Sequence, residues 1–175
     1  LTFSMVYFWN ERYMLEYCHD EVVHGKATIL QKMYGDYEDK FPQARAMYMY
    51  MMIHPGKKLN FMGNEFGQIR EWSEAQEQDW MILKYPIHDA FHKYMVKLND
   101  IYKKEKAFHY DYHRENFEWL DCHQEERCIY AFERTDGKDR IVAVFNFSDE
   151  DQKGYELPIT DAKELEVILA SDDVT

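Results

Sequence analysis

Cysteine is scarce in this sequence, which has 3 cysteines among 175 residues. Cys18, Cys122 and Cys128 are odd in number and form no Cys-x-x-Cys pair, so the sequence supports neither a disulfide framework nor a zinc site built from cysteines. A chain with few, unpaired cysteines is typical of a reducing compartment. We therefore expect a cytoplasmic protein.

Positive charge and long apolar runs are lacking as well. The chain has 21 basic and 33 acidic residues, which gives a formal net charge of -12 at pH 7. Binding to a nucleic acid or an anionic membrane requires a basic face, so we expect neither as a partner, whereas neutral and cationic ligands stay open. No run approaches the ~20 apolar residues of a membrane span, and no signal peptide is visible. Because the sequence begins with Leu1, we expect a piece of a longer protein.

The hydrophobic pattern up to about residue 106 alternates between strand and helix. After an apolar run at 5–7, strand-like runs cover residues 13–17 and 58–62, and a helical pattern covers 41–54 between them. A second helix is predicted over 87–104. Strand, helix and strand with short connections form the βαβ unit of a parallel sheet, so this part of the chain is predicted to be α/β.

From residue 117 onward the period of the pattern changes to two, which predicts an antiparallel all-β domain. Asp136-Gly137 lies between two of the runs and is a hairpin signal. The alternating runs cover residues 117–121, 127–134, 140–147, 155–158 and 165–170. We expect two domains, an α/β part at 1–106 and an all-β part at 107–175.

Three ionisable residues, His19, Asp20 and Glu21, directly follow the first strand-like run. Buried carboxylates are costly unless they are paired or hydrogen-bonded. A cluster of this kind at the end of a strand indicates chemistry on a loop that a rigid scaffold holds. The alternative is an exposed polar loop without a function.

Several motifs, in order and with consistent spacing, resemble the C-terminal third of bacterial-type 1,4-α-glucan branching enzymes, which belong to the α-amylase superfamily. They lie at residues 15–26, 32–36, 54–68, 70–72, 117–119 and 142–147. The resemblance implies the last two β/α units of a (β/α)8 barrel, followed by a C-terminal antiparallel β-sandwich. Strands seven and eight would be 13–17 and 58–62, with both following loops on the face where barrel active sites lie.

The resemblance also implies an activity and a set of site residues. A branching enzyme transfers an α-1,4-glucan segment by a retaining, covalent mechanism and forms α-1,6 branches in glycogen, without a cofactor. Asp20 would be the third catalytic carboxylate, which stabilises the oxocarbenium-like transition state. The α-glucan would be bound by His19, Glu21, Asn64, Glu65 and Trp72.

The nucleophile and the general acid of this family follow strands four and five, which these residues do not contain. We therefore expect the isolated chain to be inactive, and its truncated barrel to self-associate through open strand edges. A non-catalytic glucan-binding module built on the β domain is one alternative. A metal-binding protein is another, because Glu21 and His24 have Glu-x-x-His spacing and His88 and His92 are four residues apart on a predicted helix.

Overall fold

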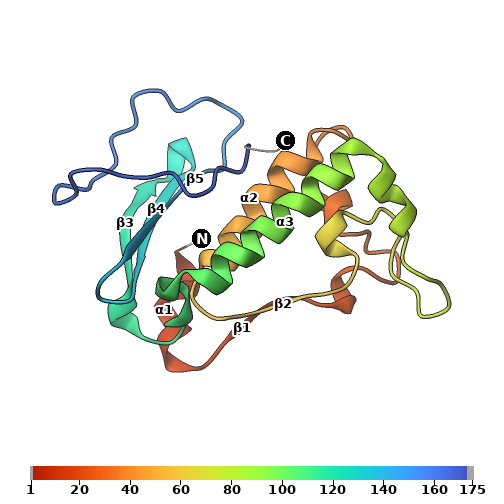
Figure 1. Ribbon diagram of the computed structural model, residues 1–175, viewed down its shortest axis with the longest axis horizontal. Helices are drawn as coiled ribbons and strands as arrows, with labels where there is room; N and C mark the ends of the chain where they lie inside the picture. Colours follow the sequence, from red (N-terminus) through yellow and green to blue (C-terminus); the bar gives the residue numbers. More distant parts are fainter. Residues whose placement is uncertain (1, 173–175) are drawn as a thin grey trace. The chain divides into compact units, whose positions relative to one another are not determined.

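The computed structural model describes residues 2–172, which form two compact units that alternate along the sequence (Figure 1). The first unit contains residues 2–13, Ile53–Lys57 and Tyr102–Ile168, and the second contains Met14–Met52, Lys58–Ile101 and 169–172. The α-helices are α1 (Phe3–Tyr7), α2 (Lys40–Ile53) and α3 (Pro86–Lys104), and the strands are β1 (Met14–Tyr17), β2 (Lys57–Asn60), β3 (Phe117–Gln124), β4 (Ile129–Thr135) and β5 (Arg140–Asn146). Short 3-10 helices cover Phe8–Asn10, His19–Glu21, Leu30–Lys32, Asn64–Phe66, Trp80–Lys84, Lys106–His109, Arg114–Asn116 and Glu125–Arg127.

The predicted strand, helix and strand are present as β1, α2 and β2, each within two residues of the expected bounds. The two strands pair, and the amide of Phe61, just after β2, donates to the carbonyl of Tyr17 at the end of β1, with an N to O distance of 2.9 Å. Both strands therefore end at the same edge. The segments that follow them start side by side, and these segments carry the predicted site residues.

The long helices α2 and α3 bury residues at helical spacing, which is why the periodic pattern identified them. Phe41 and Tyr48 of α2 and Phe91 of α3 are almost fully buried, and the rings of Phe41 and Phe91 lie 5.8 Å apart. The apolar run at 5–7 is helical, as part of α1. No helix between residues 2 and 172 is long and apolar enough to cross a membrane.

The C-terminal part of the first unit contains an antiparallel sheet in the order β3-β4-β5, so the expectation of a β-rich domain is confirmed. Ala131 and Phe132 of β4 and Phe145 of β5 are buried in its core. The hairpin between β4 and β5 turns at Asp136-Gly137, where Gly137 has a φ of 88°. The Asp136 carboxylate accepts hydrogen bonds from the amides of Lys138 and Asp139.

The predicted strands at 155–158 and 165–170 are wrong. Neither run forms a strand, and Leu165, Val167 and Ile168 are 59%, 81% and 41% exposed. An alternating pattern forms a strand only where a partner strand and a covered face stabilise it, and neither run pairs with a strand within residues 2–172. The part of the chain that is described therefore contains one three-stranded sheet and not the second sheet of a sandwich.

A buried charge pair lies in the first unit. Arg134 of β4 and Asp111 are each 1% exposed at the side chain, and their nearest charged atoms are 3.8 Å apart. The Arg134 guanidinium donates to the carbonyl of Ile53 at 2.8 Å, and the Asp111 carboxylate accepts from Lys57 Nζ at 2.7 Å and from the Gly56 amide at 3.2 Å. Burial lowers the pKa of Arg134 to about 10. These bonds connect β4 to the turn after α2.

The β1-β2 pair exposes apolar side chains. Met14 of β1, Leu59 of β2 and Met62 just after it are 54%, 39% and 51% exposed, and the sheet has only two strands within residues 2–172. Open edges and exposed apolar groups favour association.

We therefore expect the 175-residue chain to self-associate, as measured by light scattering. A Met14→Lys, Leu59→Lys double variant should shift the equilibrium toward the monomer. Val144→Lys, on exposed β5 surface, is the matched control, and a wild-type monomer at all concentrations would contradict the prediction.

Candidate active site

The segment after β1 folds into a tight turn, the 3-10 helix His19–Glu21. The amide of Cys18 donates to Glu21 Oε2 at 2.7 Å and closes this turn. The Cys18 thiol also bonds to the Glu21 carboxylate, which lowers the pKa of Glu21 and raises the pKa of Cys18. The Glu21 carboxylate thus stabilises the turn, and its predicted contact with a sugar stays a prediction.

Asp20 and His19 lie on the outer side of this turn. The Asp20 side chain is 64% exposed, and its Oδ1 atom is 3.2 Å from Nε2 of His19. Lys26 Nζ donates to the main-chain carbonyl of Asp20 at 2.8 Å, which holds the backbone and leaves the carboxylate accessible. The Asp20 carboxylate and the His19 imidazole can therefore contact one ligand together.

The ring of His19 lies beside two aromatic rings from the segment that follows β2. Its centroid is 6.0 Å from that of Phe61 and 6.3 Å from that of Trp72, and the Phe61 and Trp72 rings are 5.3 Å apart. The amide of Trp72 donates to the carbonyl of Val22 at 3.0 Å, so the two segments are joined. The structure thus brings His19, Asp20 and Trp72 to one place, as expected from the ends of neighbouring strands.

A hollow of about 540 Å³ opens beside these rings. Its lining combines an aromatic face with polar groups that can form hydrogen bonds, which suits a sugar ring. The lining residues are His19, Val23, His24, Trp72, Ser73 and Glu74. The sequence analysis missed Ser73 and Glu74, and their proximity to Trp72 was the only available signal.

Two charged residues that the sequence analysis did not identify hold the segment at 21–27. Glu71 accepts hydrogen bonds from the amides of Gly25 at 2.9 Å and Ala27 at 2.7 Å. Lys32 Nζ donates to the carbonyl of Ala27 at 2.7 Å and also to that of Glu21. These bonds join side chains to main-chain groups, which no residue pattern signals, and the two Glu71 bonds span 46 and 44 positions of the sequence.

The Glu71 contacts predict a pH dependence. The amides of Gly25 and Ala27 lower the pKa of this carboxylate, so its stabilising effect is complete above the ordinary carboxyl pKa of about 4.3 and is lost as the pH falls through the lowered value. We expect the amide NMR signals of Gly25 and Ala27 to titrate with a midpoint below about 4.3. Glu71→Gln should abolish this titration and Glu74→Gln should keep it. A midpoint at or above the ordinary value would contradict the assignment.

Asn64 and Glu65 lie in the 3-10 helix Asn64–Phe66, outside the lining of the hollow. Asn64 is buried, and its Nδ2 atom has no hydrogen-bond partner within residues 2–172. Glu65 Oε2 accepts from the amide of Gly63 at 2.8 Å. The Glu65 carboxylate thus stabilises its own turn, and the proposed role of both residues in sugar binding stays a prediction.

The two histidines of α3 do not form the metal site that their spacing suggested. His88 is fully buried, its Nδ1 atom lies 2.9 Å from the carbonyl of Phe66, and its Nε2 atom lies 2.6 Å from the hydroxyl of Tyr37. Burial lowers the pKa of His88. Because both ring nitrogens are hydrogen-bonded inside the core, this histidine stabilises the packing of α3 and is not available to a metal.

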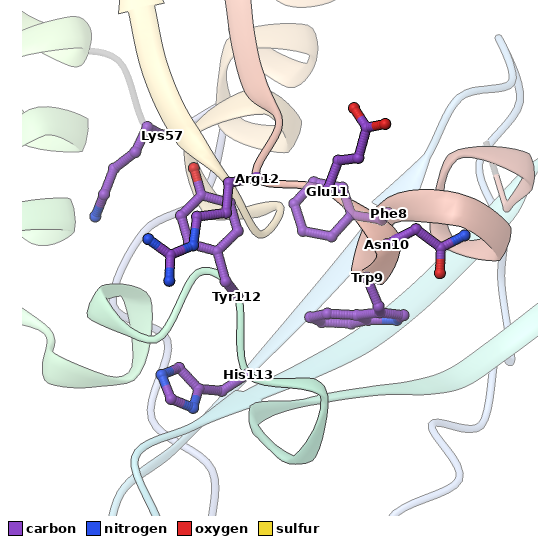
Figure 2. A pocket seen from close by; sticks show the side chains of 8 residues that line it. All are labelled: Phe8, Trp9, Asn10, Glu11, Arg12, Lys57, Tyr112 and His113. Carbon is purple, nitrogen blue, oxygen red and sulfur yellow. The ribbon is translucent and has the colours of Figure 1, made fainter.

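A second hollow, of about 580 Å³, lies in the first unit (Figure 2). The rings of Phe8 and Tyr112 stack there with centroids 6.2 Å apart, and the Tyr112 hydroxyl donates to the carbonyl of Tyr13 at 2.8 Å. The aromatic side chain of Trp9 and several polar side chains, among them Arg12, complete the lining of this hollow. None of the predicted site residues lies in this hollow.

Comparison with known proteins gives consistent matches. Residues 119–175 match the family described as alpha amylase, C-terminal all-beta domain. Relatives named 1,4-alpha-glucan branching enzyme GlgB include those of Halothermothrix orenii, 44% identical over 98% of this chain, Aquifex aeolicus, 43% identical over 94%, and Geobacillus stearothermophilus, 39% identical over 99%.

The chain spans 28% of the length of each of these three relatives. Their names favour the branching enzyme over the glucan-binding module and the metal-binding protein that the sequence left open. Over nearly its whole length the chain is thus similar to a part of the proteins named 1,4-alpha-glucan branching enzyme GlgB, and its residues 119–175 match the alpha amylase, C-terminal all-beta domain.

Proposed function

We propose that the chain is part of a cytoplasmic enzyme that cuts an α-1,4 linkage of a glucan and rejoins the released segment through an α-1,6 bond, as in glycogen synthesis. In this proposal β1 and β2 are the seventh and eighth strands of a (β/α)8 barrel, whose active site lies at the end of the strands. The single observation that carries the proposal is the exposed Asp20 carboxylate beside His19, at the shared edge where β1 and β2 end.

Each group has a distinct role in the proposed reaction. The transition state of glycosyl transfer is oxocarbenium-like, so the negative charge of Asp20 beside the sugar lowers its free energy. The His19 imidazole donates a hydrogen bond to a sugar hydroxyl, and Trp72 offers an apolar face to a ring. The nucleophile and the general acid come from other parts of the protein, so the 175-residue chain alone is inactive.

Proton NMR of amylose tests the function. With a full-length protein that contains this chain, signals of α-1,6 linkages should grow while the total number of glycosidic linkages stays constant. The 175-residue chain should produce no such signals. A rise in reducing ends without α-1,6 linkages would indicate a hydrolase. Branching by the 175-residue chain would contradict the proposal that the nucleophile and the general acid lie in other parts of the protein.

A further inference from the structure

Three potential metal ligands of different types lie together at the end of β1. The sulfur of Cys18, a ring nitrogen of His19 and a carboxylate oxygen of Asp20 all lie within 4.8 Å of one another. Thiolate, imidazole and carboxylate are ligands that Zn²⁺ accepts, at bond lengths of about 2.0–2.3 Å. Tetrahedral ligands at these lengths are about 3.5 Å apart, so small side-chain rotations would bring the three atoms to one ion.

The surroundings hold the backbone that carries these three donors. The turn that contains them is closed by the bond between the Cys18 amide and Glu21, and Lys26 fixes the Asp20 carbonyl at 2.8 Å. The ring of His19 also lies beside those of Phe61 and Trp72, with centroids 6.0 and 6.3 Å away. Binding of an ion therefore requires little ordering of the backbone at this turn.

The charges favour a divalent cation. Asp20 supplies one negative charge to the site, and Cys18 supplies a second once its thiol has lost its proton to the metal; the chain as a whole has a net charge of -12. The nearby Lys26 and Lys32 ammonium groups are bonded to main-chain carbonyls. The His19 and Asp20 side chains are each more than half exposed, which leaves an entry path and room for a water ligand.

We infer that this chain binds one Zn²⁺-class cation through Cys18 Sγ, a ring nitrogen of His19 and the carboxylate of Asp20, with water in the remaining position. The thiol releases its proton to solvent when the sulfur coordinates the ion. Bound metal occupies Asp20, so it inhibits the full-length enzyme. This inhibition rests on the proposed function, whereas the metal site itself does not.

Co²⁺ is the probe for this site, because its absorption spectrum reports a bound thiolate. Titration of the 175-residue chain should produce a sulfur-to-metal charge-transfer band at one equivalent, and Zn²⁺ should displace the Co²⁺. Cys18→Ser should remove the band and weaken binding at least about tenfold, comparable to the loss of a supporting group at other metal sites. Cys122→Ser and Cys128→Ser are the matched controls, and each should retain the charge-transfer band and the wild-type affinity for Co²⁺. A band that survives in Cys18→Ser would overturn the inference.

Alkylation of the wild-type chain provides a second test that needs no variant. Zn²⁺ should protect Cys18 from iodoacetamide, as measured by peptide mass, while Cys122 and Cys128 react at unchanged rates. Equal protection of all three cysteines, or of none, would overturn the inference. If metal bound without inhibiting the full-length enzyme, the inferred metal site would stand, and the proposed catalytic role of Asp20 would be contradicted.

Discussion

The Asp20→Asn variant of a full-length protein that contains this chain should branch amylose at least about a hundredfold more slowly than the wild type. Asparagine preserves the size of the side chain and removes the charge that, in the proposed reaction, stabilises the oxocarbenium-like transition state. Because the charge acts on the transition state, kcat should fall while KM changes little. The Asp20 side chain is 64% exposed, so the substitution should leave the fold intact.

Asp149→Asn provides the matched control for this measurement. Asp149 is an exposed carboxylate outside the candidate site, and its substitution should leave kcat and KM near the wild-type values. Circular dichroism of both variants checks the fold. If Asp20→Asn kept near-normal turnover, the segment at 18–21 would be an exposed polar loop rather than part of the catalytic machinery.

Arg134→Met should lower the free energy of unfolding by about 3–5 kcal/mol, the second large effect that we predict. Methionine fills much of the same space but leaves the Asp111 carboxylate buried with only Lys57 as a charged partner, and it removes the bond to the Ile53 carbonyl. Urea unfolding of the 175-residue chain, followed by tryptophan fluorescence, measures the change.

Two further variants separate the buried pair from the loss of a positive charge in general. Lys93 and Asp89 of α3 form an exposed pair, so Lys93→Met should have a much smaller effect, because solvent screens such pairs. Adding Asp111→Leu to Arg134→Met should recover part of the lost stability, because no unpaired buried charge remains. A loss below about 1 kcal/mol in Arg134→Met would show that the pair is not structurally important.

The sequence predicted the elements whose burial is periodic. In α2 and α3 the buried residues recur at helical spacing, and the alternating runs of β3, β4 and β5 pair into one sheet. The runs at 155–158 and 165–170 carry a similar alternation and form no strands. Local pattern cannot reveal whether a partner strand exists, since this depends on the rest of the fold.

The same limit applies to the site. His19, Asp20 and Trp72 could be placed together because the resemblance to the branching enzymes puts the segments after both strands on one face of a barrel. The roles of Glu71 and Lys32 could not be predicted, because their side chains bond to main-chain groups of another segment. Arg134 was missed for a related reason: an arginine in an alternating run indicates an exposed face, yet this one is buried beside Asp111.

The most direct test of this account is a structure of the full-length protein with a bound maltooligosaccharide. The account predicts a glucose ring whose hydroxyls lie within about 2.5–3.2 Å of the Asp20 carboxylate and the His19 imidazole. An aromatic ring of Phe61 or Trp72 should border the same sugar. An oligosaccharide that occupies the active site without any contact to Asp20 or His19 would contradict the central claim that the segment after β1 is part of the catalytic centre.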